Sequence, residues 1–290
     1  MRYEGSIYRP PSEAYSYILQ VTIGCSHNAC TFCGMYKEKN FRLRSKKEIL
    51  EDLDLARKEC AQVKRIFLAD GNALVMKTEE MLSLLEEIQG RFPEVERISL
   101  YAAPKDLLRK SSEDLKAIRE AGIDMVYLGV ESGSDNVLRK INKGCSSEEM
   151  IEAGRKAMEA GMTLSVTLIS GIGGKKLSLE HAVESARVVS KIKPHYLGLL
   201  TLLVQEGTPL FNEIQNGEFA LLSPGEALKE TKILIRKLEL DETIFRGNHP
   251  SNYVALSGTL PFDKDKLLKE IDHALENEET HLRGDQWRRL

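Results

Sequence analysis

Short apolar runs recur along the chain, and longer segments with apolar residues at helical spacing lie between them. The apolar runs fall at residues 17–23, 63–69, 97–102, 125–130, 164–169 and 196–203. The amphipathic segments fall at residues 46–60, 78–91, 111–121, 146–160, 179–192 and 224–240. Because a strand, a crossover helix and a return fit within each interval, the pattern predicts parallel strands joined by helices.

Six such units predict an α/β fold: a six-unit (βα) partial TIM-like barrel with a parallel sheet, plus a short C-terminal extension. We expect the barrel to cover residues 1–240 and the extension, residues 241–290, to cap it or pack on it. Residues 283–290 are polar and basic, and we expect them to be frayed. Chemistry in such folds lies at the carboxyl ends of the strands.

Composition narrows the class of protein. The chain has 41 Lys and Arg against 44 Asp and Glu, and this balance argues against a nucleic-acid binder that depends on phosphate contacts. The sequence shows no signal-peptide pattern, and no apolar run approaches the ~20 residues that a membrane-spanning helix needs. We therefore expect a cytoplasmic protein without a membrane partner, in which clustered cysteines bind metal or catalyse more often than they form disulfides.

Three cysteines follow the first apolar run: Cys25, Cys30 and Cys33. Three thiolates are one short of the four ligands usual in a structural zinc site or an electron-transfer iron–sulfur cluster. A [4Fe-4S] cluster held by three thiolates keeps one iron open to a substrate, which indicates a reactive cluster. Zinc held by the three cysteines, with or without His27, is the alternative. Cys60 and Cys145 are too few for a second four-thiolate cluster.

The Cys-x4-Cys-x2-Cys loop, with an aromatic residue before its third cysteine, resembles the signature of the radical S-adenosylmethionine (radical SAM) superfamily. Its four-residue first spacing is similar to that of the radical SAM domain of the elongator catalytic subunit. The resemblance implies a [4Fe-4S] cluster and SAM as cofactors, with the three cysteines as the cluster ligands. It also implies that Phe32 packs near the adenine and that Gly34, Met35 and Tyr36 supply backbone contacts.

The second run ends in Asp70, Gly71 and Asn72, at the position of the Gly-rich segment that holds the SAM ammonium in the family. Here Asp70 and Asn72 replace the family's Gly-Gly-Glu form, and a plain polar turn is the alternative for each residue singly.

The fourth run ends in Glu131, which matches the family's SAM-contacting Glu or Gln. Lys143, twelve positions later, stands where a basic residue pairs with the methionine carboxylate of SAM, and Arg139 is the competing candidate. A lysine supplies charge without the bidentate fork of arginine. A solvated helix face is the alternative for either base.

The fifth run offers Thr167 for the ribose and Ile169 for the adenine, by position in the family, or else a plain buried strand. Residues 101–103 and 205–209 end the third and sixth runs and either face the substrate or form turns. His249 lies in a polar patch of the extension, where a satisfied loop histidine is the simpler interpretation.

These resemblances imply an enzyme that cleaves SAM reductively to a 5′-deoxyadenosyl radical, which abstracts hydrogen from a substrate. A small molecule or cofactor precursor is favoured over a peptide or RNA, and the electron donor would be of the flavodoxin or ferredoxin kind. The alternatives are a zinc-binding barrel and a protein that uses SAM as a methyl donor without radical chemistry.

Overall fold

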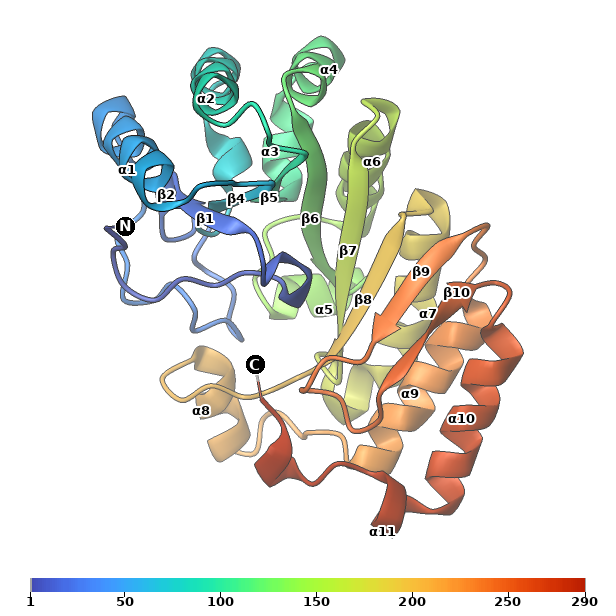
Figure 1. Ribbon diagram of the computed structural model, residues 1–290. Helices are drawn as coiled ribbons and strands as arrows, with labels where there is room; N and C mark the ends of the chain where they lie inside the picture. Colours follow the sequence, from blue (N-terminus) through green and yellow to red (C-terminus); the bar gives the residue numbers. More distant parts are fainter. Residues whose placement is uncertain (1, 290) are drawn as a thin grey trace. The chain divides into compact units, whose positions relative to one another are not determined.

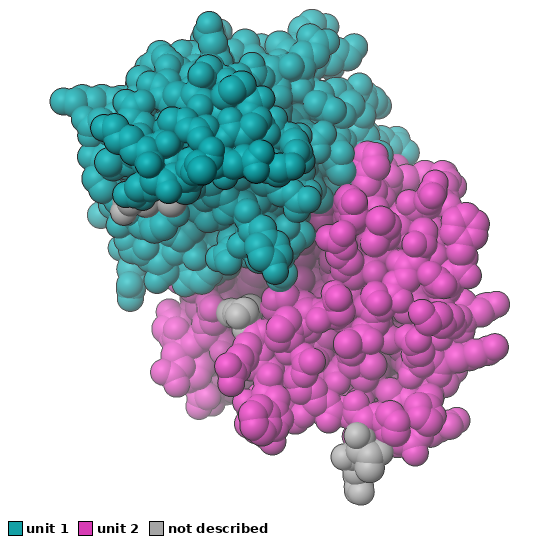
Figure 2. Space-filling model, in the orientation of Figure 1, with its two compact units in different colours: residues 1–28, 35–128, 153–164 teal, residues 29–34, 129–152, 165–290 magenta. Residues whose placement is uncertain are grey.

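A computed structural model describes residues 2–289, apart from the side chains of residues 279 and 280 (Figure 1). The chain forms two compact units, coloured separately in Figure 2. Unit 1 consists of residues 1–28, 35–128 and 153–164, and unit 2 of residues 29–34, 129–152 and 165–290. Each is described below by itself.

Unit 1 is built on parallel strands. β1 (Tyr17–Gln20) pairs with β4 (Arg65–Ala69), β4 with β5 (Arg97–Ala102), and β5 with the first part of β6 (Ile123–Glu131). Four of the five residues of β4 are buried, which is typical of a parallel strand covered on both faces. β2 (Thr22–Ile23) and β3 (Arg42–Leu43) form a separate antiparallel pair.

The helices of unit 1 begin at sequence-encoded caps. Ser45 and Glu48 form a capping box at α1 (Lys46–Glu59), and Ser111 and Asp114 form one at α4 (Ser112–Glu120). α2 (Thr78–Arg91) lies between these two helices in the row seen in Figure 1, with α3 (Pro104–Arg109) close by. Two short 3₁₀ turns, Pro11–Glu13 and Ala73–Val75, complete the unit.

Unit 2 continues the same architecture. β7 (Thr163–Ser170) pairs in parallel with β8 (Tyr196–Thr201), β8 pairs in parallel with β9 (Thr243–Gly247), and β9 pairs antiparallel with β10 (Leu256–Leu260). α7 (Gly174–Ile192), α9 (Pro224–Lys237) and α10 (Lys264–Glu276) pack side by side next to these strands (Figure 1). The described part of residues 241–290 therefore adds two strands and two helices directly to unit 2; the expected boundary at residue 240 stays a prediction.

Shorter helices carry the loops of unit 2: α5 (Asp135–Lys140), α8 (Pro209–Gln215) and α11 (Glu278–His281), with a 3₁₀ turn at Asp285–Trp287. α6 (Ser147–Glu159) begins in unit 2 and ends in unit 1. One apolar cluster joins α5, the ends of β7 and β8, and α8; its buried members are Val137, Leu138, Ile141, Ile172, Leu202, Leu210 and Phe219.

The C-terminal segment is tied down, contrary to the expected fraying. Arg283 donates to the carbonyls of Pro250 and Asn252, and Arg288 donates to those of Ser251 and Leu202. Carbonyl acceptors from distant loops thus anchor a polar segment that has no apolar stripe of its own. Residue 290 lies outside the described residues.

Five of the six expected strands and most expected helices match an element to within about two residues, with α7 beginning five residues early. The first expected strand, residues 17–23, is divided into β1 and β2, which pair in different sheets. The helices α3, α5 and α8 were not expected. Among the helices that the structure describes, none combines the length and apolar character needed to cross a membrane.

Candidate functional site

The turn after β4 holds Asp70, Gly71 and Asn72 in the interior of unit 1. The Asp70 carboxylate is fully buried and pairs through Oδ2 with the Lys39 ammonium at 2.8 Å and the Gln20 amide at 3.0 Å. Its other oxygen, Oδ1, is buried and has no hydrogen-bond partner within the described part of the chain. A buried carboxylate oxygen without a donor is costly, and a hydrogen-bond donor such as an ammonium group would satisfy it.

Asn72 is equally enclosed. Its amide nitrogen donates to Asp106 Oδ2 and to Ser26 Oγ, both at 2.7 Å. Burial raises the pKa of the Asp106 carboxyl, against the opposing effects of the Asn72 amide and the Ala103 N–H. The side chain of Asn72 therefore serves contacts inside unit 1.

Met35 and Tyr36, the expected backbone contacts, also belong to unit 1. The Tyr36 ring is buried and meets Tyr8 edge-on, with ring centroids 5.6 Å apart. Its carbonyl accepts from the Asn28 side chain at 2.8 Å. This bond closes the stretch from Asn28 to Tyr36 into a compact loop.

In unit 2, the segment 29–34 with Cys30 and Cys33 is held by backbone contacts from later in the chain. Thr31 donates its N–H to the Ile141 carbonyl at 2.9 Å and accepts from Leu210 N–H at 3.0 Å. The Gly34 N–H donates to Gln205 Oε1 at 2.6 Å. Gln205, expected to face the substrate or form a turn, thus fixes the end of the cysteine loop.

Phe32 packs against the buried apolar cluster of unit 2. Thr167 and Ile169 lie on one face of β7, because alternate residues of a strand share a face, and both are partly exposed. Ile169 contacts the same apolar cluster as Phe32. The structure therefore brings the two candidates for adenine packing onto a common apolar surface.

Glu131 and Lys143 also come together. Glu131 Oε1 and Lys143 Nζ are 3.0 Å apart, and each side chain is 13% exposed. Burial lowers the pKa of Lys143, but the negative charges of Glu131, Cys30 and Cys145 outweigh burial and raise it. The Lys143 side chain therefore keeps its positive charge beside Glu131, the last residue of β6.

Arg139, the competing base, lies on the exposed face of α5 and donates to the Asn136 side chain. Glu131 itself has a left-handed backbone conformation, with φ at +63°. Such a conformation is uncommon for a residue with a side chain and is typical of functional turns.

The sequence analysis did not predict a buried hydrogen-bond network around Glu230 and His181. Glu230 of α9 accepts from the Ser170 hydroxyl, the Gly171 N–H and the Ser178 hydroxyl at 2.6–2.8 Å. His181 Nδ1 bonds the Ser132 hydroxyl at 2.8 Å, and burial lowers the pKa of His181. The available signal was a glutamate within the apolar stripe of its helix.

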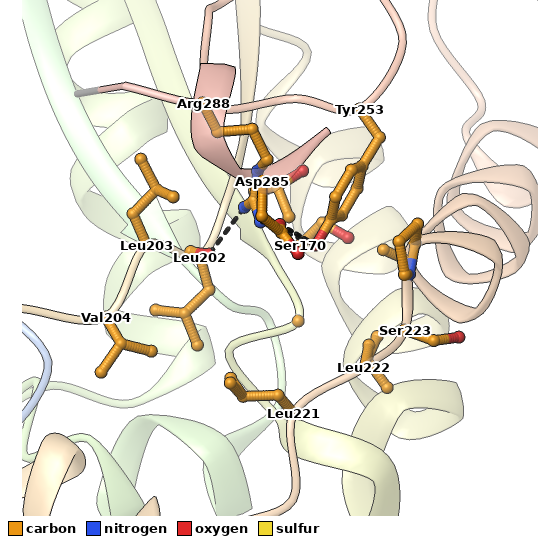
Figure 3. Close-up of a pocket in the computed structure, with 14 residues that line it drawn as sticks. Ser170, Leu202, Leu203, Val204, Leu221, Leu222, Ser223, Tyr253, Asp285 and Arg288 are labelled. Carbon is orange, nitrogen blue, oxygen red and sulfur yellow. Dashed lines mark hydrogen bonds and ion pairs between the residues drawn. The ribbon is translucent and has the colours of Figure 1, made fainter. Parts of the chain in front are cut away.

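A hollow of about 340 Å³ opens at the carboxyl ends of β7 and β8 (Figure 3). Its wall is largely aliphatic, formed by Leu202, Leu203, Val204, Leu221 and Leu222. Arg288 and Tyr253 close one side, with the guanidinium 4.1 Å from the ring centroid and its NH1 donating to Asp285. The polar groups here bond one another. His249, in the neighbouring loop, bonds Ser251 as a satisfied histidine.

All five cysteines are partly exposed. Cys25 is described within unit 1, and Cys30 and Cys33 within unit 2, where the Cys33 N–H reaches the Cys30 carbonyl at 3.4 Å. Among residues 2–289, no three His, Cys, Asp or Glu side chains are drawn together as they would be around a metal ion. The three thiols of this loop are the donors that a three-thiolate cluster needs, and within unit 1 the unpartnered oxygen of Asp70 suits a ligand with an ammonium group.

Comparison with protein families shows that residues 19–189 match the model of the radical SAM superfamily. This stretch covers more than half of the chain and includes the cysteine loop and the strand ends from β4 to β7. The chain belongs to the radical SAM superfamily. Members of this superfamily use a [4Fe-4S] cluster and SAM, the cofactors expected from the sequence.

Curated relatives of this radical SAM protein are distant. The heme chaperone HemW of Bacillus subtilis (strain 168) is 28% identical over 182 residues, which cover 61% of this chain and 46% of HemW. The biotin synthase of Methanococcus maripaludis is 26% identical over 227 residues, which cover 77% of this chain and 64% of the synthase. The chain thus spans less than two thirds of these relatives.

Solved structures show the fold. Methylornithine synthase (PylB) matches with a TM-score of 0.53 and 20% identity, covering 77% of this chain and 63% of PylB. Coproporphyrinogen III oxidase (HemN) from Escherichia coli matches with a TM-score of 0.56 and 18% identity, and the match covers 77% of this chain and 52% of HemN. The expected mostly parallel α/β fold of partial-barrel type is confirmed, and neither the zinc-barrel nor the methyl-donor alternative is favoured.

Proposed function

We propose that this protein is a radical SAM enzyme that acts on a small molecule or cofactor precursor. The observation that carries the proposal is the family match over residues 19–189, which contains the three-cysteine loop and the strand-end residues. When bound, the cluster supplies one electron to SAM, whose cleavage gives methionine and a 5′-deoxyadenosyl radical that removes a hydrogen atom from the substrate.

Cys25, Cys30 and Cys33 would hold the cluster. Their partial exposure suits thiols that must meet a ligand, and the bonds from Ile141, Leu210 and Gln205 restrain the segment that carries two of them. A restrained loop loses less conformational entropy when its thiolates bind metal.

Lys143 would bind the carboxylate of SAM. Its ammonium has three donors, of which Glu131 takes one, and its raised pKa keeps it charged at neutral pH. Glu131 would then orient the ammonium of Lys143 and would also contact the nucleoside of SAM. Exposed Arg139, bonded to Asn136, is the weaker candidate.

The other candidate residues would contact the ammonium, ribose and adenine of SAM. Asp70 Oδ1 would meet the ammonium of SAM, since it is the buried acidic atom without a donor. Thr167 would bond the ribose, while Ile169 and Phe32 would pack against the adenine from one apolar cluster. Gly71, Asn72, Met35 and Tyr36 would contribute to SAM binding from unit 1.

We further propose a cytoplasmic location and a flavodoxin or ferredoxin as electron donor. Named relatives such as biotin synthase and methylornithine synthase support a small-molecule substrate.

The test begins with anaerobic purification and analysis of iron, sulfide and zinc. Incubation with SAM and dithionite should give 5′-deoxyadenosine, whereas methyl donation would give S-adenosylhomocysteine. Cys30→Ala should abolish cluster loading, and Cys60→Ala, which changes a cysteine outside the loop, should leave it intact. Zinc in place of iron, or full iron in the Cys30 variant, would contradict the proposal. Deuterium transfer from a labelled compound to the adenosyl fragment would then identify the substrate.

A further inference from the structure

The turn formed by Asp70, Gly71 and Asn72 meets the backbone on both sides of Cys25. The Gly24 N–H donates to Asp70 Oδ2 at 3.1 Å, and the Ser26 N–H donates to Asn72 Oδ1 at 3.0 Å. The two amide groups that flank the cysteine are thus each bonded to a side chain 46 positions later in the chain.

Gly71 closes the gap between these two bonds. Its N–H donates to the Gly24 carbonyl at 3.1 Å. A Cβ on Gly71 would lie 2.7 Å from Cys25 Cβ and 2.9 Å from Cys25 Cα, nearer than such atoms approach in proteins. Only glycine permits this approach, so the turn fits against the cysteine itself.

The two accepting side chains are themselves fixed. Lys39 and Gln20 share Asp70 Oδ2, and Asp106 holds the amide nitrogen of Asn72. Both acceptors are at most 1% exposed, so water does not compete for them. The arrangement resists rotation of either side chain.

We infer that Asp70, Gly71 and Asn72 are positioning residues for Cys25: they clamp its backbone from both sides and so aim its thiol. This inference rests on the proposed role of Cys25 as a cluster ligand. It gives Asn72 a task that needs no contact with SAM, and it gives Asp70 a second task through Oδ2 beside the one proposed for Oδ1.

The cluster-free protein tests the clamp directly. In Asn72→Ala the Ser26 N–H loses its acceptor, and its hydrogen exchange should become about tenfold faster. Gly71→Ala should speed exchange across Gly24 to Ser26, because the new methyl group displaces the loop. Ser99→Ala, which alters a fully buried hydroxyl of unit 1 outside the loop, should leave these amides unchanged.

A reciprocal swap supplies the rescue. Asn72→Asp alone places a carboxylate against Asp106, but with Asp106→Asn the amide of residue 106 donates to residue 72, whose Oδ1 still accepts from Ser26, while the Ala103 N–H loses the acceptor that Asp106 Oδ2 gave it. The double variant should restore slow exchange. After reconstitution it should also restore the iron content and the electron paramagnetic resonance spectrum of the reduced cluster, which Asn72→Ala should lower and alter.

Unchanged Ser26 exchange in Asn72→Ala would overturn the clamp. If the wild-type protein takes up no iron, the proposed function fails, while the exchange data still decide whether the turn holds Cys25.

Discussion

Gly133 is the position at which one added methyl group should do most damage to the strand ends of unit 2. A Cβ there would lie 2.2 Å from the Glu184 carbonyl oxygen and 2.6 Å from Ser185 Cα. Both atoms belong to the backbone of α7, which cannot rotate away as a side chain would. Reaching the 3.0 Å limit requires a shift of roughly 0.8 Å.

The expected loss combines two causes. Overpacking against backbone costs about 1–3 kcal/mol. The shift also lengthens the bond from Gly133 N–H to Ser185 Oγ and that between Ser132 and His181, each 2.8 Å long and worth about 1 kcal/mol. We therefore expect Gly133→Ala to lower the free energy of unfolding by about 2–5 kcal/mol, which corresponds to about 5–15 °C in Tm.

Calorimetry or thermal circular dichroism measures the change. Gly90→Ala should raise the Tm by about 1–3 °C, because a methyl group in helix α2 meets no atom within 4 Å and reduces the entropy of the unfolded chain. Gly198→Ala, where the nearest atom is 3.6 Å away, is the control within unit 2. A Tm for Gly133→Ala within 2 °C or so of the wild type would refute the close packing of α7 on this turn.

Three further outcomes follow from the site and its supports. Lys143→Ala should weaken SAM binding at least tenfold in calorimetric titration without loss of iron, and Lys143→Arg should restore much of it; unchanged affinity would point to another base. Burial lowers the pKa of His181, so below about pH 6.5 the unfolded chain binds a proton that the folded chain does not. The free energy of unfolding should then fall by up to about 1.4 kcal/mol for each unit that the pH is lowered. When this free energy is measured by urea unfolding at several pH values, it should depend less steeply on pH in His181→Gln. Arg288→Ala removes the bonds to Ser251 and Leu202 and should speed tryptic cleavage after Arg283, whereas exposed Arg289→Ala should not.

Local patterns predicted most of the architecture because the signals for it are local. The period of the apolar runs located β4, β5, β7 and β8, and the amphipathic segments between them located α1, α4 and α9. Helices as short as α3 and α5 give too few turns for a period to register.

The site residues divide in a similar way. Cys30, Glu131 and Lys143 were identified because short local motifs resemble those of the family, and the structure brings the last two within 3.0 Å of each other. The task of Asn72 and the network around Glu230 depend on partners more than 40 positions away, so no local pattern reports them. The tied C-terminal segment was missed for the same reason.

The bond between the Gly34 N–H and Gln205 has a consequence for how the chain matures. It joins positions 171 residues apart, and its companion from Leu210 to Thr31 spans a similar distance. During synthesis on the ribosome, the segment with Cys30 and Cys33 therefore lacks these two restraints until residue 210 has emerged, well after Ile141 and the rest of the family-matching stretch. A fragment cut at residue 189 would carry the whole signature and still lack two of the three backbone anchors described for its loop, so we expect stable metal insertion to await the later third of the polypeptide.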